Sequence, residues 1–494
     1  MSRSIHLPAR LAGAAALTLS LAAAAQGITP GEEVRGVLRF EERLVALRNV
    51  RVIDGTGATG KDARTVILRD GRIEAVGDAS LAIPAAARVL DLEGHSVFPG
   101  LVGMHDHLLY TASIHRDASG GTPQPGGLVT QIAYTAPRLY LASGVTTIRT
   151  AGSIEPALDL NLRRKIDAGE MPGPRIDVTA PFLEGRGGLF PQMTVVQDPE
   201  HARRMVHFWA AEGATSFKAY MMITEPLLAA AIEEAHELGL KVTGHLCAVD
   251  YRRAAAIGID NLEHGPVFTD SEFVPDRQPD TCPSGRAVVA SWLDLDIASE
   301  PVQGLIRDLV ERRVAITSTL AVLEAFVPTR PLLSARQQSM MSPESLRSYL
   351  QQRAAAATST ETGLMFEAAL RKEMAFELAF VRAGGHLMMG ADPTGNGGAL
   401  PGFANLRGVQ LLVEAGFGPA EALRIASANG ATFLGKDQEI GTIEPGKLAD
   451  LVVVRGNPEQ DVADLEKVEI VFKDGYAYDP VRLLESVKGM VGIR

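Results

Sequence analysis

Two histidines, His105 and His107, close an apolar run that begins at Val97 and give the first indication of chemistry. In a β-strand, residues i and i+2 project to the same face, so the two imidazoles would point together while Asp106 points away. Neutral imidazoles are the commonest metal ligands in proteins, and the pair therefore predicts one side of a metal site. Because an H-x-H pair also occurs on ordinary surfaces, the prediction depends on partners elsewhere in the chain.

Four further residues of metal-binding or proton-transfer type close other short apolar segments: Lys218 in TSFKAYMM, His245 in KVTGHL, His264 in NLEHG and Asp392 in MMGAD. Taken singly, either histidine could be a hydrogen-bonded core residue, and Asp392 could cap a helix. Lys218 is the least expected, because an unpaired ammonium in an apolar strand is costly. Their recurrence at the ends of several strands points to one shared metal site.

The chain that carries these residues alternates predicted strands and helices. The strands end near residues 107, 150, 180, 220, 246, 264, 319 and 392, and helices are predicted over 128–143, 155–168, 199–212, 226–238, 250–257 and 301–312. Strands that alternate with helices imply parallel pairing with right-handed crossovers. Eight such units close into a (β/α)8 barrel, whose active site lies at the C-terminal ends of the strands. The candidate residues would therefore meet at one mouth.

The two ends of the chain have a different pattern. Residues 45–97 and 440–480 carry short alternating segments bounded by turn residues, which predict strands. We expect them to pair into one composite β-sandwich beside a barrel over 98–439. The predicted fold class is α/β, a (β/α)8 TIM barrel with a composite β-sandwich domain from the N- and C-terminal segments. Residues 321–380 form a helical insertion between the last two barrel strands, and the sequence does not indicate its role.

Composition limits the class of protein. Hydrophobic residues make up 46% of the chain and charged residues 22%, as in a folded globular protein. The net charge of −11 argues against nucleic acid or an anionic membrane as the main partner. Residues 1–25 have a basic start and an Ala-rich apolar run, which predict a secretory signal peptide and a periplasmic or secreted protein without stable membrane insertion.

Cys247 and Cys282 are the only cysteines, too few for a disulfide scaffold. A single bridge between them stays open. The position of Cys247, two residues after His245, favours a buried free thiol instead.

The motifs FPGLVGMHDH, SFKAY, GHL, LEHG, GAD and GTIEPGKLADLVVV resemble the metal-dependent amidohydrolase superfamily, its prolidase-like and imidazolonepropionase-like branch, over roughly residues 45–480. The resemblance implies two divalent ions, and zinc suits the imidazole and carboxylate ligands best. It implies that the more buried ion is held by His105, His107 and Asp392, the more exposed ion by His245 and His264, and both by a carbamate on Lys218. Gly103 stands where the family usually has Asp.

A binuclear site of this kind would also give roles to residues around the ions. Two ions lower the pKa of a bridging water, so that hydroxide forms near pH 7, and Asp392 would move its proton to the leaving amine. Tyr220 shares a strand face with Lys218 and could donate to the oxyanion, although it could equally fill the barrel mouth. Arg186 and His115, in loops after the third and first strands, are candidate substrate contacts.

The sequence therefore predicts an exported, binuclear metal-dependent amidohydrolase that cleaves an amide bond in a dipeptide or N-acyl amino acid, including N-acylated toxins. The K-x-Y pair formed by Lys218 and Tyr220 is similar to that of prolidase-like and carboxypeptidase-like members. The alternative is a cyclic-amide hydrolase or deaminase with a mononuclear site, against which Lys218 argues. A non-catalytic protein on this fold is disfavoured because every ligand position is filled. Homo-oligomer formation is left open.

Overall fold

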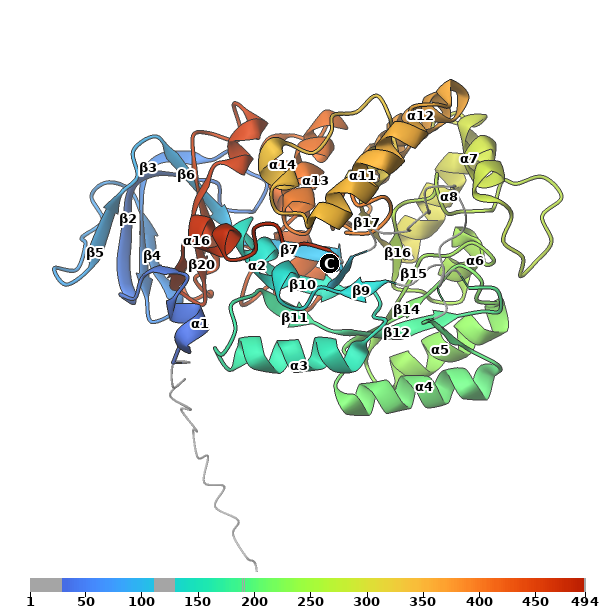
Figure 1. The fold of residues 1–494 in the computed structure, drawn as a ribbon, viewed down its shortest axis with the longest axis horizontal. Helices are drawn as coiled ribbons and strands as arrows, with labels where there is room; N and C mark the ends of the chain where they lie inside the picture. The colour runs from blue at the N-terminus through green and yellow to red at the C-terminus, as the bar shows by residue number, and fades with distance from the viewer. Residues whose placement is uncertain (1–28, 111–128, 189, 191, 493–494) are drawn as a thin grey trace, which may run out of the picture.

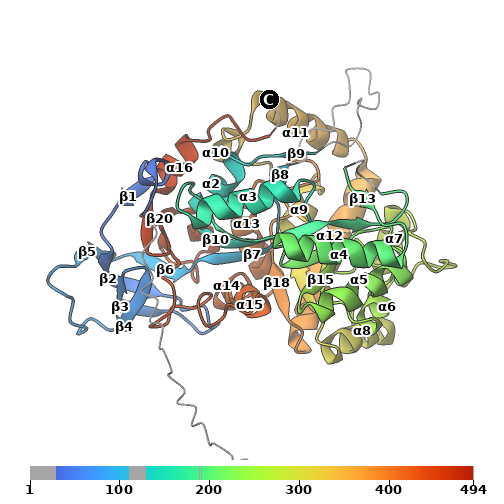
Figure 2. The same ribbon diagram turned by 90° about the horizontal axis from the view of Figure 1, so that it is seen from below.

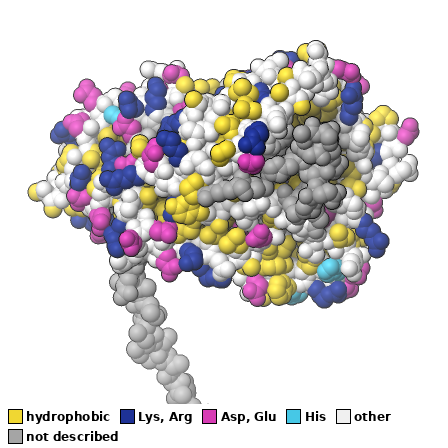
Figure 3. Space-filling model, in the orientation of Figure 1, with side chains coloured by type: hydrophobic (Ala, Val, Ile, Leu, Met, Phe, Trp, Pro, Cys, Tyr) yellow, Lys and Arg dark blue, Asp and Glu magenta, His cyan; other side chains and the backbone are white. Residues whose placement is uncertain are grey.

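The computed structural model describes residues 29–110, 129–188, 190 and 192–492 (Figure 1). The predicted signal peptide and the candidate His115 lie outside the described residues. Within the described part, no helix has both the length and the apolar character needed to cross a membrane. Figure 3 shows basic and acidic side chains interspersed over one face of the molecule.

The strands that were expected to carry the site are short, almost wholly buried and mutually parallel. They are β7 (Leu101–Asp106), β10 (Val145–Thr150), β11 (Arg175–Asp177), β12 (Thr179–Glu184), β14 (Ser216–Ala219), β15 (Lys241–Gly244), β16 (Asn261–Glu263), β17 (Ala315–Ser318) and β18 (Leu387–Met389). Hydrogen bonds join them in the orders β11-β10-β7 and β13-β12-β14-β15-β16-β17-β18, with the short β13 at Thr194–Val195. The predicted α/β class is confirmed.

The expected third strand, residues 175–180, is interrupted. It forms β11, which pairs with β10, and β12, which pairs with β14, so the parallel strands make two sheets instead of one closed ring. Two contacts link the sheets. An isolated bridge joins Ser153 to Pro181, and Asp392 N donates to His105 O at 2.8 Å beyond the end of β18. The strands thus follow the order of a barrel without a continuous closed ladder.

Helices cover the outer faces of these strands, as Figure 2 shows for α3, α4 and α5. Their bounds are α3 (Pro156–Asp167), α4 (Pro199–Glu212), α5 (Glu225–Glu237), α6 (Tyr251–Ala256), α7 (Gly285–Leu293), α8 (Glu300–Glu311), α13 (Phe403–Glu414), α14 (Pro419–Ile425) and α15 (Ala428–Phe433). Local chemistry sets these limits. The Asp198 side chain accepts from His201 N at the start of α4, and Gly213, with φ of 101°, ends it.

The helix expected over 128–143 is shorter than its pattern suggested. It is α2 (Thr135–Ala142), and the preceding Thr130–Gln131 form β9, which pairs with β8 (Leu109–Tyr110). Pairing with a strand that immediately follows the His105–His107 segment outweighed local helix preference. The result places Leu109 and Val129 together at the mouth of the parallel strands.

The two ends of the chain share one sheet of nine strands, in the order β1-β21-β20-β19-β6-β2-β3-β4 with β5 paired to β2. The strands are β1 (Leu38–Phe40), β2 (Leu44–Val52), β3 (Lys61–Arg69), β4 (Arg72–Gly77), β5 (Arg88–Asp91), β6 (His95–Pro99), β19 (Leu451–Arg455), β20 (Val468–Lys473) and β21 (Tyr476–Tyr478), flanked by α1 (Glu32–Arg35), a 3-10 turn (Val462–Glu466) and α16 (Pro480–Glu485). Antiparallel pairing of β6 with β19 joins the ends. After Pro99 the chain passes through Gly100 into β7, so this sheet anchors the strand that carries His105.

The insertion between β17 and β18 contains α9 (Leu320–Ala325), α10 (Ala335–Gln338), α11 (Pro343–Ala356) and α12 (Thr360–Arg382). Figure 1 shows α11 and α12 in orange tones. Two glutamates of α12, Glu373 and Glu377, are fully buried. Glu373 accepts from Val267 N at 2.9 Å and Glu377 from Ser318 Oγ at 3.0 Å, which ties the loop after β16 and the end of β17 to the insertion. Burial raises the pKa of both carboxyls, that of Glu377 to about 8.

This buried pair predicts a pH dependence of stability. Because Glu377 binds its proton more tightly in the folded state than in the unfolded one, its contribution is present below pH 4.5 and is lost as the pH rises to about 8. Glu377→Gln should shrink the fall in Tm between pH 5.5 and pH 8.5 by roughly 2 °C or more. Thermal unfolding at both pH values measures this. Glu361→Gln, at an exposed position of the same helix, is the control, and equal falls in all three proteins would contradict the prediction.

The structure corrects the expectation of a free thiol, because Cys247 and Cys282 form a disulfide that spans 35 residues. The bridge ties the loop directly after His245 to the segment that precedes α7. Spacing along the chain could not show this, since the two cysteines meet only through the path of the long connection after β16.

Removal of the bridge should destabilise the protein. For a loop of this length the chain-entropy account gives about 3–4 kcal/mol. We expect the double variant Cys247→Ser/Cys282→Ser to lower the free energy of unfolding in urea by that amount, and reduced wild-type protein to match it. A variant as stable as the oxidised protein would contradict the prediction.

Candidate metal centre

The residues expected to act together line one cavity of about 470 Å³ at the C-terminal ends of the parallel strands. They are His105, His107, Lys218, Tyr220, His245, His264 and Asp392. His105, His264 and Asp392 are buried and place potential ligand atoms within 4.8 Å of one another. This grouping differs from the one that the family resemblance implied, which assigned His105 and Asp392 to one ion and His264 to the other.

The ring orientations of the first two histidines suit metal binding. His105 Nδ1 lies 2.8 Å from Glu263 Oε2, and His107 Nδ1 lies 3.1 Å from Gly152 O. Both partners only accept hydrogen bonds, so each Nδ1 carries the proton and each Nε2 keeps its lone pair. The two Nε2 atoms lie 3.6 and 3.4 Å from Asp392 Oδ1, which forms a set of one oxygen and two nitrogen donors.

His245 and His264 lie beside this set. Their ring centroids are 4.5 Å apart, and His264 is also 4.5 Å from His105. His264 Nδ1 is 2.7 Å from Thr319 Oγ1, the residue that directly follows β17. The Tyr220 ring lies against His245, with 4.8 Å between centroids, and against Phe182. Two adjacent strand ends thus contribute imidazoles on the side of the cavity next to Lys218.

Lys218 is the unusual member of the group. Its side chain is wholly buried, and Nζ makes no hydrogen bond among the described residues; Glu263 Oε1 is 3.7 Å away. Burial lowers the pKa of the amine to about 8. An amine that is partly neutral and lacks a close partner fits conversion to an anionic carbamate, whose oxygens can ligate cations. The donor set therefore fits the divalent ions that the resemblance implied.

Electrostatics keeps the histidines in the metal-binding form. Burial lowers the pKa of His105 to about 4 and of His245 to about 3, so both rings are neutral at pH 7. Burial alone would raise the pKa of Asp392, but the neighbouring His105 and His107 lower it below its ordinary value. The carboxylate is therefore ionised. A neutral nitrogen and an anionic oxygen are the states in which these side chains ligate metals.

Backbone strain occurs at two of the candidate ligands. His264 has φ of 71° and Asp392 has φ of 45°, a region that few residues other than glycine adopt. His264 N donates to Thr317 O and Asp392 N to His105 O, which hold these conformations in place. Strain of this kind clusters at functional sites, where surrounding structure fixes the side-chain direction.

Glu263 is the residue that sequence reasoning missed. It is fully buried and accepts from Arg149 Nη2 at 2.7 Å, from Asn261 Nδ2 at 3.0 Å and from Thr243 Oγ1, in addition to its contact with His105. Burial alone would raise its pKa, but Lys218 and Arg149 hold the pKa well below the ordinary range. The signal was present in the motif LEHG, where an acidic residue stands inside an apolar strand.

The structure also explains why a glycine occupies position 103. A Cβ at this position would overlap the carboxylate of Asp106, which accepts from Asn405 Nδ2 at 2.9 Å. Asp106 points away from the cavity, as the strand pattern indicated. The departure from the family pattern at Gly103 therefore makes room for a buried carboxylate of the same strand.

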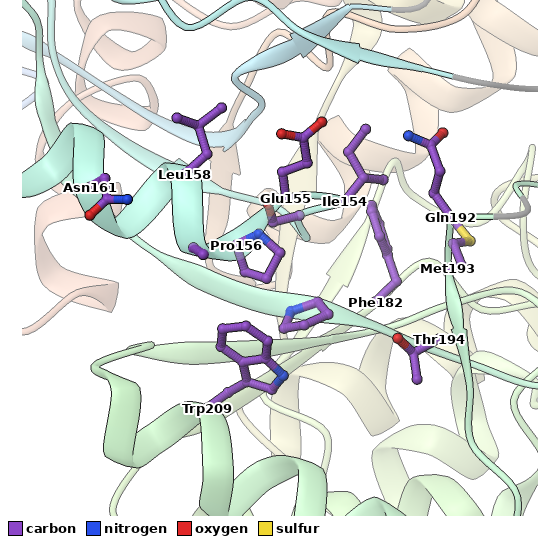
Figure 4. Close-up of a pocket in the computed structure, with 13 residues that line it drawn as sticks. Ile154, Glu155, Pro156, Leu158, Asn161, Phe182, Gln192, Met193, Thr194 and Trp209 are labelled. Carbon is purple, nitrogen blue, oxygen red and sulfur yellow. Dashed lines mark hydrogen bonds between the residues drawn. The ribbon is translucent and has the colours of Figure 1, made fainter.

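The remaining candidates lie apart from the centre. Arg186 is exposed and is not among the described residues that line the cavity. Its role in substrate binding stays a prediction, as does that of His115. Figure 4 shows a second cavity of about 510 Å³, which shares the side chains of Ile154 and Phe182 with the first and reaches Trp209. Phe182 thus stands between the candidate metal centre and this outer cavity.

Fold and site together define an α/β protein with a candidate metal centre, and comparisons with known proteins bear on its class. Residues 353–477 match the amidohydrolase family. Over 90% of this chain and 99% of the other, the structure is similar to that of a putative prolidase from Bifidobacterium longum, with 26% sequence identity and a TM-score of 0.63. No curated protein matches the sequence.

Two further solved structures share the fold. One is a Xaa-Pro dipeptidase with bound methionine in its active site, 21% identical over 88% of this chain and 100% of the other, with a TM-score of 0.63. The other is a bottromycin amidohydrolase, 20% identical over 93% and 95% of the two chains, with a TM-score of 0.66. The family match over residues 353–477 and the similarity to the putative prolidase agree with the superfamily that the sequence motifs indicated, and they support a hydrolase that acts on carbon–nitrogen bonds.

The contacts of Glu263 predict a double effect of Glu263→Gln. The substitution leaves the Arg149 and Lys218 cations without their carboxylate, which should lower the free energy of unfolding of the metal-free protein by roughly 3 kcal/mol. It also allows an amide N–H to face His105 Nδ1, which favours the wrong tautomer and should weaken metal binding by about 10- to 100-fold.

Urea unfolding and metal titration of the metal-free protein measure the two effects of Glu263→Gln. Glu93→Gln, at an exposed position in the turn between β5 and β6, is the control. Wild-type stability together with wild-type metal affinity would contradict a central role for this carboxylate.

Proposed function

We propose that this protein is an exported hydrolase that uses two divalent metal ions to cleave an amide bond in a dipeptide or N-acyl amino acid. The observation that carries the proposal is the convergence of four histidines, one aspartate and a buried lysine in a single cavity, the lysine having no hydrogen bond to any residue that the structure describes. The names of the similar structures, a putative prolidase and a Xaa-Pro dipeptidase, support a substrate with a peptide-like amide bond.

The side chains that would hold the ions are those around Asp392. His105, His107 and Asp392 offer one donor set, and His245, His264 and a carbamate on Lys218 offer the second. When bound, such ions polarise the substrate carbonyl and make water acidic enough to attack it near neutral pH. Zinc suits this combination of imidazole and carboxylate donors.

The protein's own groups complete the reaction. Asp392 is an ionised carboxylate at the centre of the histidines, so it can accept the proton of the attacking water and pass it to the leaving nitrogen. The pKa of Tyr220 is raised by burial, then by Asp392 and Glu184, so its phenol keeps its proton and can donate a hydrogen bond to the oxyanion. The apolar walls of the cavity limit the access of bulk water.

Export is supported by two features. The first 25 residues have the composition of a signal peptide, and the Cys247–Cys282 bridge is of the kind that persists in oxidising compartments. The proposed location is the periplasm or the medium. There the enzyme would meet peptides and N-acylated small molecules, including toxins.

A second candidate is a cyclic-amide hydrolase or deaminase with a single ion. The observation in its favour is that His105, His264 and Asp392 alone bring their ligand atoms within 4.8 Å of one another. In that case Lys218 would have a structural role only.

Metal content of the purified protein separates the two candidates. We expect about two ions per chain by plasma mass spectrometry, falling to one or fewer in Lys218→Ala, with a loss of dipeptide and N-acyl amino acid hydrolysis of more than about 100-fold. Short carboxylic acids should restore part of the activity of this variant by replacing the carbamate. Lys165→Ala, at an exposed position of α3, is the control. One ion per chain in wild type and variant alike would favour the mononuclear candidate.

A further inference from the structure

Besides the candidate metal ligands, the cavity is lined by many apolar side chains. Its remaining wall is largely apolar, and one side is built by Phe268, Phe326 and Phe366, which we call the aromatic shelf. Phe268 lies in the loop after β16, whereas Phe326 follows α9 and Phe366 lies in α12. Two of its three rings therefore come from the insertion between β17 and β18, for which the sequence indicated no role.

The three rings form a continuous surface. Phe366 is stacked on Phe268, with centroids 6.3 Å apart and an interplanar angle of 6°, and on Phe326, with 6.0 Å and 25°. All three remain partly exposed although they lie in a cavity, whereas Val322 and Leu323 beside them are buried. Exposed aromatic faces that are grouped in a concave site are typical of ligand-binding pockets.

Charge is confined to one end of the cavity. Among the described lining residues, the charged or metal-ligating side chains are the six candidate ligands, and the other polar groups are Tyr220, Thr269, Gln352 and Thr394. The single lysine, Lys218, belongs to the metal centre. None of the described lining residues offers a cation to a carboxylate placed over the aromatic shelf, so the desolvation of such a carboxylate would be costly.

We propose that the substrate carries a bulky, uncharged and preferentially aromatic group next to the scissile amide, and that the aromatic shelf binds this group. The inference rests on the proposed amide hydrolysis and specifies its substrate class. A cavity of about 470 Å³ has room for a bicyclic ring beside the reacting amide. Small polar dipeptides would leave the shelf exposed to water and are poor substrates.

Two series of amides test the proposal with the metal-loaded full-length enzyme. One series enlarges the acyl group on alanine from acetyl through hexanoyl to 2-naphthoyl. The other keeps the acetyl group and enlarges the amino acid from alanine through phenylalanine to naphthylalanine. We expect kcat/KM to rise by at least about tenfold along one series, because the shelf buries the added apolar surface.

Phe366→Ala should lower the ratio of kcat/KM for the naphthyl substrate to that for N-acetylalanine by at least about tenfold. Leu364→Ala is the matched control, because Leu364 lies two residues earlier in α12 and is 62% exposed on the outer surface. Phe326→Leu, which retains apolar volume but loses the ring, serves if Phe366→Ala does not fold. Rates that stay flat along both series, or a ratio that Phe366→Ala leaves unchanged, overturn the proposal.

A failure of the proposed amide hydrolysis can be told apart from a failure of the aromatic shelf. If the loaded enzyme hydrolyses no amide, calorimetric titration with 2-naphthamide decides the question for the shelf alone. Binding to the wild type that Phe366→Ala abolishes supports the shelf while the hydrolase proposal falls. Absence of binding to the wild type overturns the shelf as well.

Discussion

The carboxylate of Glu263 is the interaction on which the candidate site depends. It lies between the parallel strands with no access to water, and such a charge is tolerated only when it is fully paired. Arg149, Asn261 and Thr243 satisfy one oxygen, and His105 satisfies the other. The same group that stabilises the interior therefore also selects the tautomer of a candidate ligand. One side chain therefore links the packing of the interior to the geometry of the candidate metal centre.

The frame around this centre is assembled from distant parts of the chain. Pairing of β6 with β19 joins the two ends, and β6 continues through Gly100 into the strand that carries His105 and His107. The opposite side is held by the insertion, through Glu373 and Glu377 on α12 and through the hydrogen bond of Thr319 to His264. Both sides are needed because His264 and Asp392 have backbone conformations that would relax without neighbours to hold them.

The cavity has one end lined by charged and metal-ligating side chains and a wall that is largely apolar. The ligating residues gather at the strand ends, where backbone geometry fixes their directions. Most of the apolar wall comes from loops and from the insertion, which are the parts that differ most freely on a given scaffold. In this protein the parallel strands supply the candidate metal ligands, and the insertion supplies Phe326 and Phe366, which line the same cavity.

The sequence by itself determined the α/β class, the approximate positions of the parallel strands other than the third, and the six candidate ligands that meet in the cavity. These depend on local alternation and on the rule that parallel strands present their C-terminal ends together, and both can be read from residue order. The tertiary structure alone decided the split of the third strand, the Cys247–Cys282 bridge, the exposed position of Arg186 and the central place of Glu263. Each of these depends on which distant segments pack together, and no local pattern records the partner of a buried carboxylate or thiol.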